Sequence, residues 1–276
     1  MSFGLSLNDS YWIVPKDSNY QWKNYNLYNN NFSKALALVA FVGYSKKIQG
    51  VITSPEFTTN GMLKKCWHRD EKGNIELLKG STERFANGGL EAYTEYYACQ
   101  LASLFELPHV DYDLKIFHNE LVSSCPLFTS EDVGYMPIYY FMNKESRNVN
   151  KLSDFSNQYE IAKIIGIEFF EDLMFFHSLI YNTDRHLGNF GLLVNNNTGD
   201  ILKPAPIFDN GLSLFSRGTK KDIQNLGIYS KQLVSAFGLS FDEQAEYYYR
   251  ERHRKYLHKL RNFTFKRHEQ YNLLEE

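Results

Sequence analysis

A long apolar segment, from Tyr159 to Ile180, constrains the fold of this 276-residue chain more than any other feature of its sequence. It contains no proline and a single glycine, Gly166, so it predicts a buried helix in a mostly helical part of the molecule. We expect this helix to end at Asn182-Thr183, because a polar stretch from residue 184 to residue 189 begins there. The sequence therefore predicts a polar loop held directly against a buried helix.

The residues after this loop predict a hairpin and then a second tight turn. Phe190–Val194 and Ile201–Lys203 are short apolar runs on either side of an asparagine-rich stretch that is typical of turns. Asp209 then follows an apolar residue and precedes Asn210-Gly211, which favours a tight turn with a carboxylate at its start.

The first half of the chain has a different texture, with short apolar runs separated by turn residues. Lys72-Gly73-Asn74 and His118-Asn119 are turn signals. One stretch without glycine or proline, residues 90–105, has helical spacing. Four runs are expected to be strands: Leu63–His68, Ile75–Lys79, Val110–Phe117 and Glu120–Ser124.

These patterns predict an α+β fold with two lobes. Residues 1–145 are expected to form a small antiparallel sheet with one helix, and residues 146–276 a mostly helical lobe. A ligand is expected to bind between the two lobes, because clefts between domains are common binding sites.

Composition excludes several classes of protein. The formal net charge is −2, so nothing calls for a nucleic acid or an anionic membrane as partner. Cys66, Cys99 and Cys125 show no C-x-x-C spacing, which argues against a disulfide framework and a zinc site. We see no basic N-terminal stretch before an apolar run, and no apolar run of about 20 residues, so neither a secretory signal nor a membrane span is expected. A cytoplasmic location is the resulting expectation.

The loop after the apolar segment carries the strongest chemical signal. Asp184 and Asn189 are five positions apart, the separation at which protein kinases place a catalytic carboxylate and a metal-binding amide. Asp209 suits a second ligand for a hard cation. The alternative is a solvated turn in which Asp184 and Asn189 cap backbone N–H groups. The buried helix before the loop, the hairpin after it and the Asp209 turn together favour phosphoryl transfer.

Phosphoryl transfer also needs a cation on the nucleotide phosphates, and the first half of the chain offers one. Lys79 ends a mostly apolar predicted strand, and Glu95 lies in the predicted helix, where it is suited to pair with the lysine. Glu91, one helical turn earlier, is the competing partner. The alternatives are a lysine that protects a sheet edge and a glutamate on an exposed helix face.

A candidate phosphate-covering segment begins with Thr58, Thr59, Asn60 and Gly61 and runs to Lys65. Backbone N–H groups on a glycine turn can approach phosphates closely. The segment has neither G-x-G-x-x-G nor Walker spacing, so an ordinary hairpin turn is the alternative.

Two histidines and a basic run are expected to serve the structure rather than the chemistry. His177, on the apolar segment, is expected to be a core residue, and His186 is expected to support the backbone of its loop. The run from Arg250 to Lys255 is expected to be the solvated face of a helix.

The two motifs of the second half resemble those of the HipA-like serine/threonine kinases, which include toxin kinases of bacterial toxin–antitoxin modules and related stand-alone kinases. The first is Asn-Thr-Asp-Arg-His-Leu-Gly-Asn-Phe at residues 182–190, and the second is Ala-Pro-Ile-Phe-Asp-Asn-Gly at residues 205–211. The Asp-Arg-His-x-x-Asn form is also similar to that of phosphatidylinositol 3/4-kinases. The resemblance extends over roughly residues 51–215 and implies a two-lobed protein-kinase-like fold.

The resemblance implies a role for each matching residue. Asp184 would be the catalytic aspartate, and Asn189 and Asp209 would hold Mg²⁺. Lys79 would bind the α- and β-phosphates of ATP, with Glu95 as its partner.

Two further parts of a nucleotide site follow from the same resemblance. Residues 58–65 would be the phosphate loop, which in this family can carry an autophosphorylated hydroxyl that switches the kinase off. Thr58 and Thr59 stand where serine is commoner. The hinge that meets adenine would include Pro126 and Phe128.

The sequence thus predicts an ATP- and Mg²⁺-dependent serine/threonine protein kinase that acts on a protein substrate with a Ser or Thr acceptor. A separately encoded antitoxin-like or DNA-binding partner is a further expectation of the resemblance, although the chain is shorter than full-length HipA toxins. One alternative is a lipid or small-molecule kinase. A basic, apolar region after Asp209 would favour a lipid substrate, but residues 213–221 mix both features and do not decide the question. Another is a pseudokinase-like interaction module, which predicts the loss of at least one catalytic residue.

Overall fold

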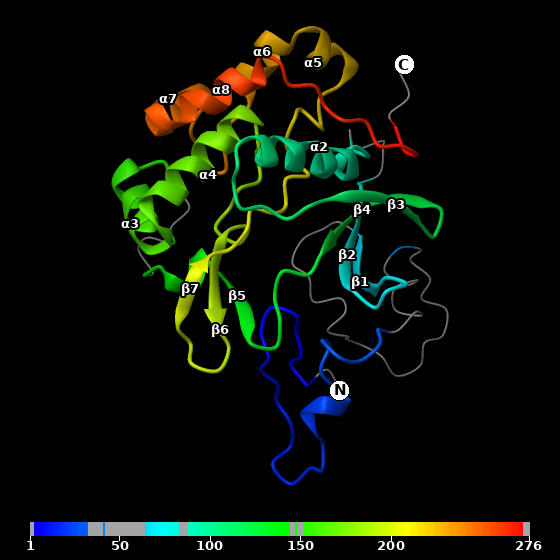
Figure 1. The fold of residues 1–276 in the computed structure, drawn as a ribbon. Coiled ribbons are helices and arrows are strands. Elements are labelled where there is room, and N and C mark those ends of the chain that lie inside the picture. The colour runs from blue at the N-terminus through cyan, green and yellow to red at the C-terminus, as the bar shows by residue number, and fades with distance from the viewer. Residues whose placement is uncertain are drawn as a thin grey trace.

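The structure, a computed structural model, describes residues 3–32, 41, 64–82, 88–143, 147 and 152–272. Within these ranges the chain forms two lobes, each containing an antiparallel sheet (Figure 1). This confirms the two-lobed α+β fold that the sequence predicts. All three cysteines lie in the described ranges, are buried and form no disulfide. Over the same ranges, each helix is either too short or too polar to cross a bilayer.

The first sheet has four antiparallel strands in the order β1-β2-β4-β3. Between β1 and β2, Asp70 Oδ1 accepts a hydrogen bond from the backbone N–H of Asn74 (2.7 Å), and Gly73 has a φ of +85°. Between β3 and β4, His118 and Asn119 both have positive φ, as in the tight turns that suit hairpins. Both predicted turns are therefore present. The strands are β1 (Lys65–Arg69), β2 (Ile75–Gly80), β3 (Asp113–Phe117) and β4 (Glu120–Pro126).

Helix α2 (Glu91–Leu104) lies between the first sheet and the second lobe (Figure 1). It begins beside Gly89, whose backbone N–H donates to the Glu91 carboxylate at 2.9 Å. Ala98 and Ala102 are fully buried in the main core, together with residues of the second lobe. The close packing of α2 therefore fixes the first sheet relative to the second lobe.

The second sheet has three antiparallel strands in the order β5-β6-β7. The predicted hairpin is its β6–β7 pair, whereas β5 is an addition that the sequence did not predict. Gly191 in β6 lies opposite Pro137 in β5, and a Cβ there would be 2.2 Å from the Met136 carbonyl oxygen, so the close pairing requires glycine. The strands are β5 (Val133–Pro137), β6 (Gly191–Asn195) and β7 (Ile201–Pro204).

The long apolar segment forms two helices, α3 (Phe155–Ile165) and α4 (Ile167–Leu179). The prediction of one continuous helix is wrong because Gly166 has a φ of +103°, which an α-helix does not contain. Helix α4 remains deeply buried, with Phe170 and Phe176 inaccessible to solvent. It leads into the polar loop, as predicted.

Four short α-helices follow the second sheet, and the described ranges also contain three short 3₁₀ helices. Side chains of Thr219 and Ser240 cap α5 and α7 in reciprocal capping boxes. The α-helices are α5 (Lys220–Gln224), α6 (Leu226–Gln232), α7 (Phe241–Tyr248) and α8 (Arg254–Leu260). The 3₁₀ helices are η1 (Trp22–Asn24), η4 (Ile138–Phe141) and η6 (Glu251–His253).

The basic run before α8 is not simply a solvated face. Arg252 donates to Glu171 and to Asp172 of α4, at 2.8 Å each. The ring of His253 is buried, lies 2.7 Å from the Asp172 carboxylate and stacks on Phe175 at 4.3 Å between ring centroids. The expectation of a solvated face is wrong for these two residues because α4 presents matching carboxylates.

Candidate active site

Lys79 lies at the centre of a buried ion-pair cluster. It is 5% exposed, in β2, and its Nζ contacts Oε1 of Glu95 on α2 and Oδ1 of Asp209. Glu91, the competing partner, instead accepts a hydrogen bond from the backbone N–H of Gly89. The predicted Lys79–Glu95 pair is therefore present, and Asp209 joins it from a distant part of the chain.

The three charges of this cluster shift one another's pKa values. Burial acts to lower the pKa of Lys79, but the carboxylates of Asp209 and Glu95 outweigh it and raise the pKa. Burial acts to raise the pKa of Asp209, but the Lys79 ammonium holds it at about 2. Burial raises the pKa of Glu95, an effect that Lys79 opposes. Lys79 and Asp209 are therefore charged at neutral pH.

The turn that carries Asp209 is fixed by side chains of the first lobe. The hydroxyl of Tyr112 accepts the backbone N–H of Asp209 at 3.1 Å, and Oε2 of Glu95 accepts the backbone N–H of Asn210 at 2.7 Å. Asp209 has a φ of +59°, a left-handed conformation that is uncommon outside glycine. These bonds hold the Asp209 carboxylate toward Lys79.

A buried arginine joins the 184–189 loop to the same turn. Arg185 is 2% exposed, and its Nη2 donates to the carbonyl oxygens of Phe208 (2.6 Å) and Asp209 (3.0 Å). Its Nη1 donates to the carbonyl oxygen of Asn189, and its Nε donates to Nε2 of His177 at 3.2 Å. Burial holds the pKa of His177 well below its ordinary value, so the ring is neutral and accepts this bond.

Short polar contacts shape the loop itself. The backbone N–H of Asp184 donates to Oδ1 of Asn182 at 2.9 Å, and Nδ2 of Asn189 donates to the Asp184 carbonyl oxygen at 2.9 Å. Nδ1 of His186 accepts the backbone N–H of Gly188 at 3.0 Å, which is the supporting role expected of this histidine. Asp184 and Asn189 are therefore held in one local frame.

Asp184 is a half-buried carboxylate whose pKa depends on burial and on the charges around it. Burial raises its pKa, the Asp209 charge adds to the rise, and His186 opposes it. A carboxylate with a raised pKa accepts a proton more readily than an ordinary aspartate does.

A cavity of about 140 Å³ lies beside the cluster. Its walls include Lys79, Asn189 and Asp209, together with Pro126 and Phe128 of the predicted hinge. The structure thus brings these five predicted site residues together. Two other predicted residues meet the cavity indirectly: Glu95 through its ion pair, and Asp184 through its hydrogen bond from the loop amide.

Aromatic rings form the apolar part of this cavity. The ring centroids of Phe128 and Phe208 are 5.4 Å apart, and those of Tyr135 and Phe208 are 5.3 Å apart. All three residues line the cavity. They offer flat apolar surface for a ring-shaped ligand close to charged groups suited to phosphate.

Asn189 and Asp209 fit the ligand set of Mg²⁺. Both line the same cavity, and because Nδ2 of Asn189 is engaged by the backbone, its amide oxygen is the atom available to a cation. Mg²⁺ takes oxygen ligands and commonly binds through one or two protein side chains plus substrate phosphates. In the described part of the chain, no group of three or more His, Cys, Asp or Glu side chains is arranged to hold a metal ion.

Thr58, Thr59, Asn60 and Gly61 lie outside the described residues. Lys65, at the end of that predicted phosphate loop, opens β1, pairs in register with Lys79 and lines the cavity.

Sequence reasoning did not assign Arg185 and Tyr112. Arg185 stands inside the recognised motif, which is a usable signal, but its partners Phe208 and Asp209 are 23 and 24 residues away. Tyr112 meets Asp209 across 97 residues and carries no local signal.

The chain is similar to a known protein kinase. No protein-family model matches the chain. The serine/threonine-protein kinase CtkA of Helicobacter pylori (strain J99 / ATCC 700824) is 29% identical over 141 residues, which cover 48% of this chain. The match spans 42% of CtkA, which is less than half of that relative.

One solved kinase structure shows the same fold. The crystal structure of the Helicobacter pylori proinflammatory kinase CtkA aligns with a TM-score of 0.53 and 19% identity, and the alignment covers 74% of this chain and 88% of that one. HipA of Shewanella oneidensis MR-1, solved with HipB and operator DNA, aligns with a TM-score of 0.42 and 10% identity over 91% of this chain and 68% of HipA. The second score is too low to support an inference about this chain. Over about half of its length the chain is homologous to the kinase CtkA, and it shares the fold of that kinase.

Proposed function

We propose that this chain is an ATP- and Mg²⁺-dependent serine/threonine protein kinase. One observation carries the proposal: Lys79 contacts both Glu95 and Asp209 at the wall of a cavity that Asn189 also lines. Protein kinases combine a strand lysine paired to a helix glutamate with an aspartate and an asparagine that hold the metal ions. Homology to a serine/threonine kinase supports the same class of reaction.

In the proposed complex, ATP lies with its base toward the hinge at Pro126 and its phosphates toward Lys79. The Lys79 ammonium stabilises negative charge on the α- and β-phosphates, and Glu95 keeps it in place. Mg²⁺, held by Asn189 and Asp209, supplies further neutralisation of phosphate charge when it is bound.

Asp184 has the role of proton acceptor. The hydroxyl oxygen of a substrate Ser or Thr bonds to the γ-phosphorus of ATP, and its proton passes to the Asp184 carboxylate. The bond between the γ-phosphorus and the β–γ bridging oxygen breaks, so ADP leaves with that electron pair. The raised pKa of Asp184, caused by burial and by Asp209, suits a group that must take up a proton.

The direct test measures transfer of labelled phosphate from ATP to a mixture of proteins. Asp184→Asn and Asp209→Asn are each expected to lower the rate by about 100-fold or more while the protein remains folded at the assay temperature. Asp222→Asn is the matched control, because Asp222 is partly exposed and caps α5 away from the cavity. Wild-type rates in both active-site variants would refute the proposal.

We also propose that the kinase phosphorylates itself on Thr58 or Thr59. The resemblance to HipA-like kinases supports this, since both residues fall in the predicted phosphate loop. Mass spectrometry after incubation with ATP and Mg²⁺ is expected to find phosphate on one of the two threonines, and none in Asp184→Asn. Phosphate elsewhere only, or unchanged labelling of the Thr58→Ala/Thr59→Ala double variant, contradicts the assignment. An antitoxin-like or DNA-binding partner stays a prediction of the resemblance.

A further inference from the structure

The N-terminal segment, residues 3–32, crosses the region where the two lobes meet; we call it the strap. It is drawn in blue in Figure 1, below both sheets. Apart from η1 it has no regular secondary structure, and no role is predicted for it from the sequence. Its contacts nevertheless tie it to both lobes and to the candidate nucleotide cavity.

On the first lobe, the strap is held by an arginine and by an apolar cluster. Nη2 of Arg69, at the end of β1, donates to the carbonyl oxygens of Tyr28 (2.6 Å) and Leu27 (3.2 Å). Leu5 and Leu7 are 6% and 3% exposed and, with Leu27, pack with partly buried residues that include Trp67, Ile75 and Leu127. Burial of this kind fixes a segment that has no helix or strand of its own.

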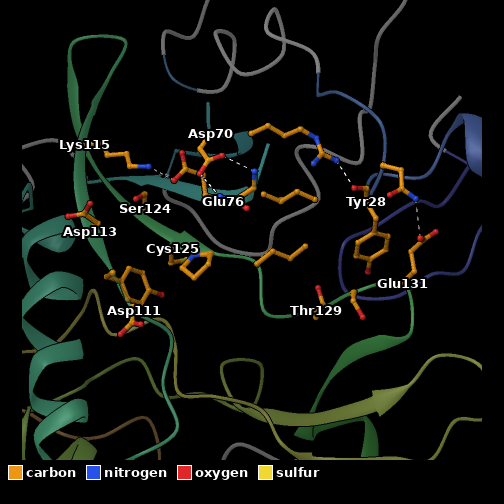
Figure 2. A pocket seen from close by; sticks show the side chains of 18 residues that line it. Tyr28, Asp70, Glu76, Asp111, Asp113, Lys115, Ser124, Cys125, Thr129 and Glu131 are labelled. Atoms are coloured by element: carbon orange, nitrogen blue, oxygen red, sulfur yellow. Dashed lines mark hydrogen bonds and ion pairs between the residues drawn. The ribbon is translucent and has the colours of Figure 1, made fainter. Parts of the chain in front are cut away.

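Just after the hinge, a glutamate binds the second half of the strap, which includes Trp22 and Asn29. Oε1 of Glu131 accepts from the indole N–H of Trp22 at 2.6 Å, and Oε2 accepts from the amide of Asn29 at 3.0 Å. Figure 2 shows Tyr28 of the strap beside Thr129 and Glu131, around a groove on the outer side of the hinge. The strap therefore lies against the hinge itself.

Residues 6–8 of the strap contact the second sheet and line the cavity. The hydroxyl of Thr129 donates to the Leu7 carbonyl oxygen, and the backbone N–H of Tyr135 in β5 donates to the Asn8 carbonyl oxygen at 2.7 Å. Residues 6–8 line the candidate nucleotide cavity. Gly134 permits this approach, because a Cβ there would lie 2.8 Å from the Asn8 carbonyl oxygen.

We propose that residues 6–8 of the strap form a wall of the nucleotide site at the end that holds the base, and so set the affinity for the base of ATP. The inference rests on the proposed function. It follows from position: the strap meets Thr129 and Tyr135, on the hinge side of the cavity, whereas Lys79 and Asp209 mark the phosphate side. The two-sided anchoring makes this wall a fixed part of the site rather than a covering that must leave before ATP enters.

Two variants displace the strap from positions outside the catalytic cluster. Glu131→Ala removes the acceptors of Trp22 and Asn29. Gly134→Ala places a Cβ 2.8 Å from the Asn8 carbonyl oxygen and 2.3 Å from Oδ1 of Asn196, so both groups must shift away from β5. Glu120→Ala is the matched control, because it removes a carboxylate that pairs with Lys64 at 2.6 Å in the first lobe and touches no strap residue in the described contacts. Hydrogen exchange of the Tyr135 amide reports whether the strap has moved.

The measurement is the dissociation constant of ATP and of inorganic tripolyphosphate, each with Mg²⁺, by calorimetry. In both strap variants we expect ATP to bind about fivefold or more weakly, tripolyphosphate to bind as in the wild type, and kcat to change less than about twofold while KM for ATP rises. The control is expected to match the wild type in every value.

The outcomes separate this inference from the proposed function. If the wild type binds ATP, and exchange at Tyr135 shows a displaced strap with unchanged ATP affinity, the strap is no part of the site. Tighter ATP binding or faster turnover in the variants also overturns the proposal, since the strap would then obstruct the site. A parallel loss of tripolyphosphate binding overturns the assignment to the base end. A wild type that binds no ATP removes the proposed function, and the inference falls with it.

Discussion

The guanidinium of Arg185 donates a hydrogen bond to the carbonyl oxygen of Asp209 at 3.0 Å, although the two residues are 24 positions apart in the chain. The same nitrogen reaches Oδ1 of Asn210 at 2.8 Å. Arg185 is 2% exposed, and burial lowers its pKa while the Asp209 and Glu95 charges oppose this. One buried side chain therefore sets the distance between the proposed base and the proposed metal ligand.

Replacing Arg185 by lysine is expected to lower the free energy of unfolding. A lysine keeps the charge, but one ammonium cannot match the fork that reaches Asn189, Phe208 and Asn210 together. We expect a loss of about 2 to 4 kcal/mol in the free energy of unfolding, because buried acceptors lose a charged donor. Urea unfolding measures it, with Arg254→Lys, an exposed arginine, as control. Equal stability of the two variants contradicts the structural role.

The Lys79–Glu95 pair allows a double-variant test that separates folding from binding. Lys79→Met leaves Glu95, 1% exposed, without its cation, and an unpaired buried carboxylate costs about 3 kcal/mol or more. Adding Glu95→Gln removes that charge, so part of the stability is expected to return. ATP binding is not expected to return, because the second substitution does not restore the Lys79 ammonium that faces the α- and β-phosphates in the proposed complex. Urea unfolding measures the stability, and calorimetry measures the ATP affinity. Recovery of ATP affinity in the double variant contradicts the role of Lys79.

The sequence predicted the elements that local chemistry determines. The turns at Lys72-Gly73-Asn74 and His118-Asn119, and the hairpin after residue 190, are present because their turn residues adopt positive φ or cap their own backbone. Asp184 and Asn189 of the 184–189 motif also make local bonds, to Asn182 and to each other, whereas Arg185 of the same motif bonds to the distant turn at residues 208–210.

Elements that depend on distant partners were missed or misjudged. β5 contains Gly134 and Pro137, both unfavourable for an isolated strand, and is stabilised by pairing with β6 more than 50 residues later. A single glycine such as Gly166 is compatible with a helix in the sequence, yet its positive φ divides the apolar segment into α3 and α4. The strap shows no periodicity at all, because its order comes from packing on the hinge. No local pattern predicts such contacts.

The pH dependence of turnover tests the role of Asp184. Burial and the Asp209 charge raise its pKa above the ordinary 3.8. A base must be unprotonated to act, so kcat/KM is expected to fall as the pH drops through this raised value, and the acidic limb should lie above the ordinary range of aspartate. His186 lowers the pKa of Asp184, so His186→Gln is expected to move the limb to higher pH. A limb that stays in place in this variant, or lies below the ordinary value, contradicts the assignment.

Acid unfolding tests the Lys79–Asp209 ion pair without any measurement of activity. Against the effect of burial, the Lys79 ammonium lowers the pKa of Asp209 from 3.8 to about 2 in the folded chain. A carboxyl group whose pKa is lower when folded stabilises the fold above the unfolded pKa, and this contribution disappears as the pH falls through the folded pKa. The stability that wild type has in excess of Asp209→Asn is therefore expected to be constant above pH 3.8 and to vanish as the pH approaches about 2. Urea midpoints of both proteins across this window measure the difference, which cancels the titration of the other carboxylates. A difference that stays constant down to the lowest pH means that Asp209 does not draw its stabilising effect from Lys79.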